Sequence, residues 1–225
     1  MTTSTPSKPL HIEFLIEDAS GKSLLEALLP RLLGPLGQPH SWRVHGYKGI
    51  GTVPPGLGSV GDPSKRILLQ QLPRLLRGYG KTKGIDAVVI VLDTDRRDCR
   101  TVLAELQEVL NHCHPAPKTM FRLAIEEIEA WYFGDQSALL KAYPKADKKV
   151  LKKYQQDSVC GTWESLADAI HPGGSKSLLK TGWPAPGQAK CVWAARIGPL
   201  LDPDNNCSPS FCKLRDGVRR LVSES

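Results

Sequence analysis

The sequence lacks any apolar run that approaches the roughly 20 residues needed to cross a membrane as a helix. Its first residues, MTTSTPSKP, also lack the basic start and the apolar core that are typical of a secretion signal. We therefore expect a cytoplasmic protein with no membrane partner.

Cysteine pairs with metal-ligand spacing are missing as well. The six cysteines, at positions 99, 113, 160, 191, 207 and 212, include no Cys-x-x-Cys pair of the kind found in structural zinc sites and redox motifs. We expect reduced thiols. The chain has no internal repeat and no low-complexity tract, and its apolar fraction of 40% is ordinary, which excludes the fibrous and disordered classes. Its 225 residues suit one domain, or one domain with an appendage.

The charge of the chain is basic, with a net charge of +7 and a pI of about 9.1. A basic balance is a mild indication of a polyanionic partner such as nucleic acid. Many basic proteins bind no nucleic acid, so this alternative stays open.

Strand-like and helix-like patterns alternate along the first part of the chain. Short apolar runs predict buried strands at 10–17 and 85–92, alternation predicts a strand at 41–47, and we expect a further short strand at 118–125. Helical spacing between them favours a parallel sheet with helices on its faces, an α/β core over residues 8–135. Beyond it, short helical segments divided by Gly and Pro predict a helical C-terminal subdomain over residues 136–225.

Local signals predict where several helices begin. Ser20 is the expected N-cap of a helix that ends at Gly34, and a second helical pattern starts at Pro63. The segment EEIEAWYFGD, from residue 126, predicts a helix with Glu126, Glu127 and Glu129 in its first turn, where acids are favourable. Glu126 and Glu129 would share one face of that helix.

Acidic residues follow two of the predicted strands. Glu17 follows the first strand, and Asp93 and Asp95 follow the third. Ligands of open parallel sheets gather at the carboxyl ends of the strands, and in an extended chain Asp93 and Asp95 point to the same side. Converging carboxylates need a compensating cation, and oxygen ligands favour Mg²⁺ over zinc. The structural alternative is that these acids cap helices or form turns.

Other candidate motifs are weaker. Gly21-Lys22-Ser23 resembles the end of a phosphate-binding P-loop, but Ile16 stands where that motif requires its first glycine, which excludes a P-loop. The side chains of Lys48, Lys176 and Lys190 are candidates for phosphate contacts, against the alternative that they are solvated surface lysines.

A strand that ends in Glu, followed by a later strand that ends in Asp-x-Asp, resembles the Toprim fold of topoisomerases, primases and overcoming-lysogenization-defect nucleases. A narrower resemblance covers nearly the whole chain. The segments EFLIEDAS, HGYKG, VVIVLDTDRRDCR, RLAIEEIEAWYFGD, KCVWAARIGPLLDPDNN and SPSF are similar to the domain-of-unknown-function 4276 family.

The resemblance implies a Toprim-like sheet whose metal ligands are Glu17, Asp93 and Asp95, with Glu129 as the counterpart of a Glu that precedes an aromatic residue in related nucleases. It implies Mg²⁺ or Mn²⁺, cleavage of DNA or else RNA, with Lys48 as a candidate to neutralise the phosphate, and an ABC-type ATPase partner in anti-phage abortive infection. One departure stands out: the usual Glu-Gly-x-Ser/Thr-Glu is here Glu17-Asp18-Ala19-Ser20-Gly21. Asp18 is therefore either a displaced ligand, or the second metal position is weakened.

Two other functions use the same residues. An inert Toprim-like module would bind an ATPase or nucleic acid without cleavage, and a Mg²⁺-dependent phosphatase would act on small phosphate esters. A homo-oligomer is a further open alternative.

Overall fold

The computed structural model describes residues 8–57, 62–158, 160–182 and 184–224. Residues 1–7 lie outside this range. The expectation that the chain has no secretion signal rests largely on these residues. In the part of the chain that is described, no helix is both long and apolar enough to cross a membrane. All six cysteines carry free thiols, as expected.

Four parallel strands form the sheet, in the order β2-β1-β3-β4. They are β1 (His11–Ile16), β2 (Ser41–Gly46), β3 (Ala87–Asp93) and β4 (Lys118–Ala124). The predicted α/β architecture is confirmed. Because the chain adds β2 on one side of β1 and β3 on the other, the strand order reverses between β1 and β3, at the position where open α/β sheets bind ligands.

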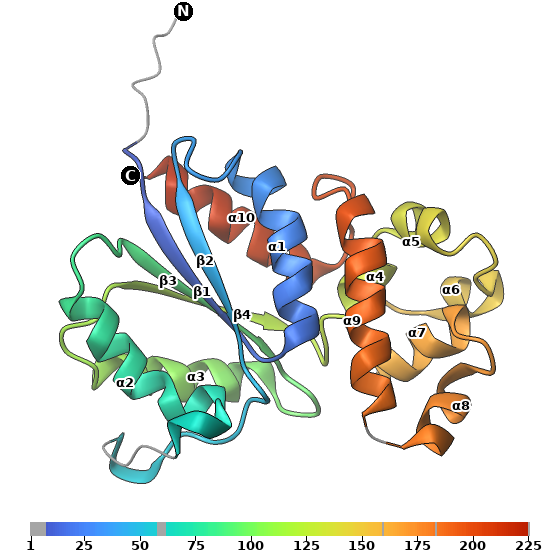
Figure 1. The fold of residues 1–225 in the computed structure, drawn as a ribbon, viewed down its shortest axis with the longest axis horizontal. Helices are drawn as coiled ribbons and strands as arrows, with labels where there is room; N and C mark the ends of the chain where they lie inside the picture. Colours follow the sequence, from blue (N-terminus) through green and yellow to red (C-terminus); the bar gives the residue numbers. More distant parts are fainter. Residues whose placement is uncertain (1–7, 58–61, 159, 183, 225) are drawn as a thin grey trace, which may run out of the picture.

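Helices cover both faces of the sheet, which explains why β1 and β3 are almost continuously apolar. In β1, Ile12, Phe14 and Ile16 pack on the side of α1 (Ala19–Leu33), whereas Leu15 packs on the opposite side. Figure 1 shows α2 (Leu68–Lys81) and α3 (Cys99–Asn111) below the sheet, and α1 and α10 (Pro209–Ser223) above it.

Two predicted helix starts are wrong. Asp18, not Ser20, is the N-cap of α1, because the helix begins at Ala19 and the Asp18 side chain accepts a hydrogen bond of 2.7 Å from the N–H of Gly21. The regular part of α2 begins at Leu68 rather than at Pro63. Two short 3-10 turns precede it, at Pro55–Leu57 and Pro63–Lys65.

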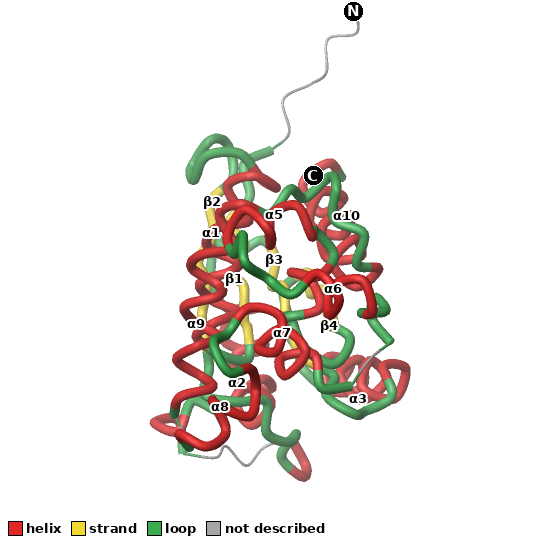
Figure 2. Tube along the Cα trace, turned by 90° about the vertical axis from the view of Figure 1, so that its right-hand side faces the viewer, coloured by secondary structure: helices red, strands yellow, loops and turns green. Residues whose placement is uncertain are grey.

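The rest of the chain is helical, as predicted. Its elements are α4 (Ala130–Phe133), α5 (Gln136–Ala142), α6 (Lys148–Lys153), α7 (Thr162–Ile170), α8 (Gly174–Thr181), α9 (Ala185–Ile197), the 3-10 turn Gly198–Leu200, and α10. Figure 1 shows the strands running toward α4–α9, so the carboxyl edge of the sheet faces these helices. In Figure 2, α5, α6 and α7 lie in front of the sheet. We call α4–α9 the helical lobe.

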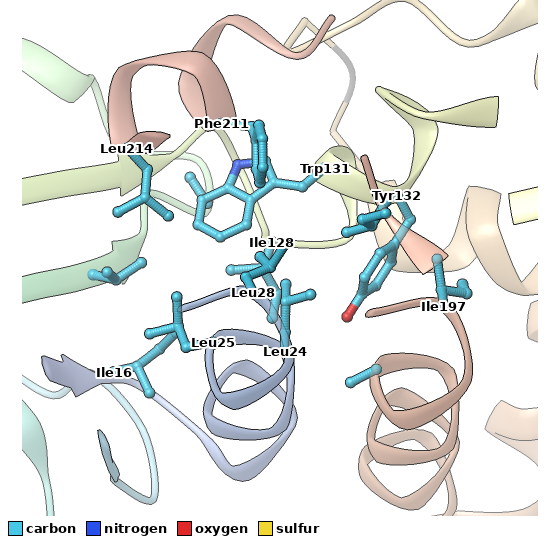
Figure 3. Packing of buried hydrophobic residues seen from close by; sticks show 14 of the residues in the cluster. Ile16, Leu24, Leu25, Leu28, Ile128, Trp131, Tyr132, Ile197, Phe211 and Leu214 are labelled. Atoms are coloured by element: carbon cyan, nitrogen blue, oxygen red, sulfur yellow. The ribbon is translucent and has the colours of Figure 1, made fainter. Parts of the chain in front are cut away.

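The helix α4 joins the lobe to the sheet. Its aromatic residues Trp131, Tyr132 and Phe133 are fully buried. Trp131 meets the ring of Phe211 on α10 edge to face, at 5.7 Å between centroids, and its indole N–H donates to Ser210 Oγ at 2.9 Å. Figure 3 shows Trp131 beside Phe211 and Leu214, while Tyr132 lies on the side of Ile197 of α9. One hydrophobic cluster therefore runs from the sheet into the lobe.

Candidate functional site

Two acids lie at the point where the strand order reverses. Glu17 directly follows β1, and Asp93 is the last residue of β3, the neighbouring strand. The backbone of Asp93 is close enough to the Glu17 carboxylate to lower its pKa against the effect of burial. One carboxylate oxygen of Glu17, Oε2, is buried and has no hydrogen-bond partner among the described residues.

The loop after β4 is held against the loop after β3. The N–H of Thr94 donates to the carbonyl of Ala124 at 3.1 Å, and the N–H of Asp95 donates to the carbonyl of Glu126 at 2.9 Å. The carboxylate of Asp93 accepts a hydrogen bond of 3.2 Å from the N–H of Ile128. These bonds bring residues 125–129 to the carboxyl edge of the sheet, beside Glu17 and Asp93.

Glu129 is the most deeply buried acid of the site, with 0% of its surface exposed. Neither of its carboxylate oxygens has a hydrogen-bond partner. The ammonium of Lys190, from α9, lies 3.5 Å from Glu129 Oε2 and forms an ion pair with it. Burying a charge without hydrogen bonds is costly, so the Glu129 oxygens are poorly satisfied in the protein alone.

Lys190 also contacts a second acid and an aromatic ring. Its ammonium donates to Glu127 Oε1 at 2.9 Å and lies 6.0 Å from the centre of the Trp163 ring. Glu127, Trp163 and Lys190 line a cavity of about 280 Å³ between α7, α8 and α9. The site therefore combines a compact acidic group with one buried cation.

Burial makes the charged forms of the acids unfavourable. Burial, together with the charges of Asp95 and Asp18, raises the pKa of Glu17 to about 7. Burial also raises the pKa of Glu129 to about 7, against the lowering effect of Lys190. The pKa of Asp93 lies well above its usual range because of burial and the nearby charges of Glu17 and Glu129. Such clusters of shifted carboxylates are typical of functional sites.

The positive partner is shifted by the same charges. Burial disfavours the ammonium of Lys190, but the charges of Glu129, Glu127 and Asp93 outweigh that effect and raise its pKa. Lys190 therefore stays charged, and its charge partly offsets those of the acids.

Asp95 differs from the other acids of the site in its exposure to solvent. The chain does not stay extended through Asp93-Thr94-Asp95, because Asp95 adopts a φ of +48°. The extended segment in which Asp93 and Asp95 would point to the same side is therefore not formed. Asp95 is exposed, and its charge still acts on Glu17.

The predicted helix start at Glu126 is also wrong. Residues 125–129 form turns, and α4 begins at Ala130, because the loop bonds to residues 94 and 95 compete with helix formation. Glu126, with a φ of +58°, points away from Glu129 and accepts hydrogen bonds from the N–H groups of Gly161 and Thr162 at 2.5 and 2.8 Å. Its role is to cap α7.

The remaining candidates lie at the surface or have a structural partner. The backbone of Lys48 is close to Glu17, because the next residue, Gly49, donates its N–H to the Glu17 carbonyl at 3.0 Å, but the Lys48 side chain is exposed. Lys176, on α8, is exposed as well. The carboxylate of Asp18 accepts hydrogen bonds from the Gly21 N–H and the Ser20 hydroxyl, both at 2.7 Å. These bonds make it the N-cap of α1.

Sequence reasoning missed the group formed by Glu127, Trp163 and Lys190. Glu127 and Lys190 are 63 residues apart, and no local pattern indicates that α9 returns to the carboxyl edge of the sheet. The sequence shows only that a lysine and several acids are present, and it does not indicate that they pair with one another.

The donor set fits a hard cation in its chemistry. Glu17, Asp93 and Glu129 offer carboxylate oxygens, three of which, on Glu17 and Glu129, are buried without hydrogen-bond partners. Among the residues that the structure describes, no three His, Cys, Asp or Glu side chains are arranged to hold a metal ion as they stand.

A comparison with known protein families supports one part of the resemblance. The family model described as "Domain of unknown function (DUF4276)" matches residues 16–219. Neither the curated proteins nor the solved structures contain a significant match to the chain. The match covers β2, β3, β4 and the helical lobe, together with the last residue of β1 and every acid described above. The chain therefore belongs to the DUF4276 family.

Proposed function

We propose that the protein is a divalent-metal-dependent nuclease that hydrolyses phosphodiester bonds, with DNA as the favoured substrate and RNA as the alternative. The observation that carries this proposal is that Glu17 and Glu129 lie near enough to Asp93 for their charges to raise its pKa, at the reversal point of a parallel sheet. Three of the buried oxygens of Glu17 and Glu129 have no hydrogen-bond partner among the described residues. Buried carboxylates without hydrogen bonds disfavour folding, and a cation is the natural compensation.

Glu17, Asp93 and Glu129 would hold the ion, and Asp95 would approach it from the exposed side. A hard divalent ion such as Mg²⁺ or Mn²⁺, when bound, supplies the Lewis acidity that activates water and offsets charge on the phosphate. The Ile128 N–H keeps the Asp93 carboxylate in one orientation, and the burial of Glu129 keeps bulk water away from it.

The lysines have separate roles in this proposal. The ammonium of Lys190 forms ion pairs with Glu127 and Glu129 and so reduces the repulsion between these two carboxylates. Lys48, exposed beside the end of β1, is placed to meet a phosphate from the solvent side. Of the two, Lys48 is the candidate to neutralise substrate charge.

The resemblance to Toprim nucleases supports the same activity. It also supports a cytoplasmic location and a role as the effector of an anti-phage abortive-infection system, together with an ABC-type ATPase. These statements rest on the family likeness and on the acids, and the structure describes no partner chain.

A cleavage assay tests the activity. Purified protein is incubated with plasmid, single-stranded DNA and RNA in Mg²⁺ or Mn²⁺. Each reaction is run with and without the proposed ABC-type ATPase partner. We expect Asp93→Asn and Glu129→Gln to lower cleavage at least about 100-fold, whereas Glu108→Gln, an exposed acid on α3, leaves it unchanged. Full cleavage by Asp93→Asn would contradict the proposal.

One observation favours the inert module as the second candidate. Lys190 already pairs with Glu127 and Glu129, so part of the acid charge is compensated without a metal. If no substrate is cut even with the ATPase present, and the Asp93→Asn variant still binds the ATPase, the module replaces the nuclease. Turnover of nucleotides or phosphate esters without polynucleotide cleavage would instead favour the phosphatase.

A further inference from the structure

The positive charge of the protein is unevenly distributed along the chain. Residues 136–225 contain 14 of the 30 Lys and Arg residues and 8 of the 23 Asp and Glu residues, so they carry a net charge of +6 out of the total of +7. The residues before them, which form the sheet and its acidic site, are nearly neutral. The excess positive charge is therefore a property of the C-terminal part.

Much of this charge lies in one short segment on α5, α6 and the loop between them. We call it the six-lysine surface: Lys141, Lys145, Lys148, Lys149, Lys152 and Lys153. All six side chains are exposed, and within the described residues none forms an ion pair. The one acid in the segment, Asp147, is the N-cap of α6.

Taken together, the lysines on α6 do not stabilise that helix. Lys148 and Lys149 occupy the first turn of α6, where a cation opposes the helix dipole. Lys148 and Lys152 are four residues apart, as are Lys149 and Lys153, and like charges at that spacing destabilise a helix by about 0.2–0.5 kcal/mol per pair. The exception is the last turn, where Lys152 and Lys153 are favourable to the dipole.

The surface is held rigidly rather than on a loose tail. Leu151 is buried, and its carbonyl accepts a hydrogen bond of 3.2 Å from the Gln136 side chain. The N–H of Asp147 donates to the carbonyl of Ala169 on α7 at 2.8 Å. Just after α6, the Tyr154 ring stacks on Phe133 at 3.8 Å. The positive charges therefore have a fixed place on the lobe.

The six-lysine surface belongs to the same lobe as the acid site. The helix α6 packs on α7, and α7 carries Trp163, whose ring lies under Lys190. The first turn of α7 is capped by Glu126, from the loop that also carries Glu129. Figures 1 and 2 show α5 and α6 at the outer side of the lobe, beyond α7 and α9.

We propose that the six-lysine surface binds the phosphate backbone of a nucleic acid and holds it on the lobe beside the acid site. This inference rests on the proposed function for the choice of polyanion. Rows of exposed, unpaired lysines bind phosphates by releasing counterions, without reading sequence. The surface is thus a general anchoring site for the substrate, separate from the residues that act on the bond.

A membrane surface is the less fitting partner. Helices that bind at lipid interfaces present a large apolar face next to their basic residues. The apolar residues of α6 face inward, with Leu151 buried and Val150 packed against the core. Large exposed apolar side chains of the described residues lie elsewhere, at Leu36, Leu103, Leu179, Val192 and Leu200.

Fluorescence anisotropy with the full chain tests the surface directly. Labelled single-stranded DNA, duplex DNA and RNA are titrated in EDTA, so that no cleavage takes place. The lobe variant changes Lys148, Lys149, Lys152 and Lys153 to Gln. A matched control also introduces four Gln residues, at exposed basic positions outside the lobe: Lys81, Lys83, Arg100 and Lys213. Thermal unfolding of both variants checks that the fold is kept.

We expect the lobe variant to bind at least about tenfold more weakly, while the control stays within about twofold of the parent protein. The slope of log affinity against log salt concentration should become shallower by up to about 3 for the lobe variant, since each phosphate contact contributes about 0.7–0.9. Equal affinities for the two variants would overturn the proposal. So would the absence of binding by the parent protein, or binding by the same lysines to anionic vesicles but not to nucleic acid.

The design also separates this inference from the proposed function. If Asp93→Asn binds normally in EDTA and the parent protein cuts nothing in Mg²⁺, the nuclease proposal fails and the anchoring surface stands. If the parent protein cuts and the lobe variant binds like the control, the surface fails and the nuclease stands.

Discussion

Asp93 is an acid whose charge opposes folding. Its pKa and those of Glu17 and Glu129 are raised, so the folded protein binds more protons than the unfolded chain between about pH 4.5 and pH 7. In the metal-free protein the stability contributed by these groups is complete at low pH and is lost as the pH rises through that window.

The variant Asp93→Asn isolates this effect. An amide keeps the oxygen that accepts the Ile128 N–H but removes the charge. We expect the metal-free variant to be more stable than the parent protein by about 1–3 kcal/mol at pH 8, and we expect this difference to shrink as the pH falls and to vanish only below about pH 4, where the unfolded Asp93 is protonated as well. Urea unfolding in EDTA across this range measures the difference, and a difference that does not change with pH would contradict the shifted pKa values.

Lys190 has the opposite role, because its positive charge makes the burial of Glu127 and Glu129 tolerable. Removing one member of a buried ion pair leaves the other charge uncompensated. We expect Lys190→Met to lower the free energy of unfolding by about 3–5 kcal/mol, and the double variant with Glu129→Gln to recover a large part of that loss.

The matched control is Lys176→Met, an exposed lysine on α8, for which we expect a change within about 0.5 kcal/mol. Chemical unfolding at pH 8 compares the three variants. A Lys190→Met protein as stable as the control would show that the ion pair contributes little.

Single residues were the part of the site that the sequence predicted best. Glu17 and Asp93 could be chosen because acids that end buried strands must meet at one edge of a parallel sheet. The pairing of Lys190 with Glu127 and Glu129 could not be chosen, since it depends on where α9 packs. The exposed place of Asp95 depends on a single left-handed residue, which the spacing of Asp-x-Asp does not reveal.

At the scale of elements, the loop after β4 links the acid site to the helical lobe. Glu126 caps α7 through the N–H groups of Gly161 and Thr162, from 35 residues away. We expect Glu126→Ala to lower the free energy of unfolding by about 1–3 kcal/mol, because it removes the acceptor of two backbone hydrogen bonds at the start of α7.

Hydrogen exchange of the α7 amides measures this effect locally. The amides of residues 161 and 162 should exchange faster in Glu126→Ala and should not change in Glu26→Ala, an exposed acid on α1. Unchanged protection at α7 would mean that packing alone holds its first turn.

The strands and most helices were predictable, because buried parallel strands and amphipathic helices leave strong patterns. The errors fall at helix starts, where several polar residues compete for one role. Asp18, rather than Ser20, is the N-cap of α1. The acidic segment after β4 forms hydrogen bonds with the neighbouring loop, and a helix does not begin there. Tertiary hydrogen bonds decided these positions, and they leave no local signal.

At the scale of the whole molecule, the sheet and the lobe share one hydrophobic cluster. The helices α9 and α10 return from the lobe to pack on α1 and β4, so the C-terminal part also completes the cover of the sheet. The parallel sheet itself was predictable, but this return was not, because it depends on contacts between residues far apart in the sequence.

We expect the sheet and the lobe to unfold in one cooperative transition. Fluorine NMR of fluorotryptophan-labelled protein separates Trp42, on β2, from Trp163 and Trp193, in the lobe. All three signals should change at the same urea concentration, and Trp131→Ala should lower that concentration for both parts, with a loss of about 3–5 kcal/mol. Two separate transitions would contradict the shared cluster.

The proposed nuclease activity depends on the binding of a divalent cation by Glu17, Asp93 and Glu129. Titration with Mn²⁺, followed by electron paramagnetic resonance, measures that binding without any need for a substrate. We predict saturable binding by the parent protein, competition by Mg²⁺, and an affinity at least about tenfold lower in Asp93→Asn but unchanged in Glu108→Gln. No binding, or equal binding by Asp93→Asn, would contradict the metal site and leave the acids as charges held by Lys190 alone.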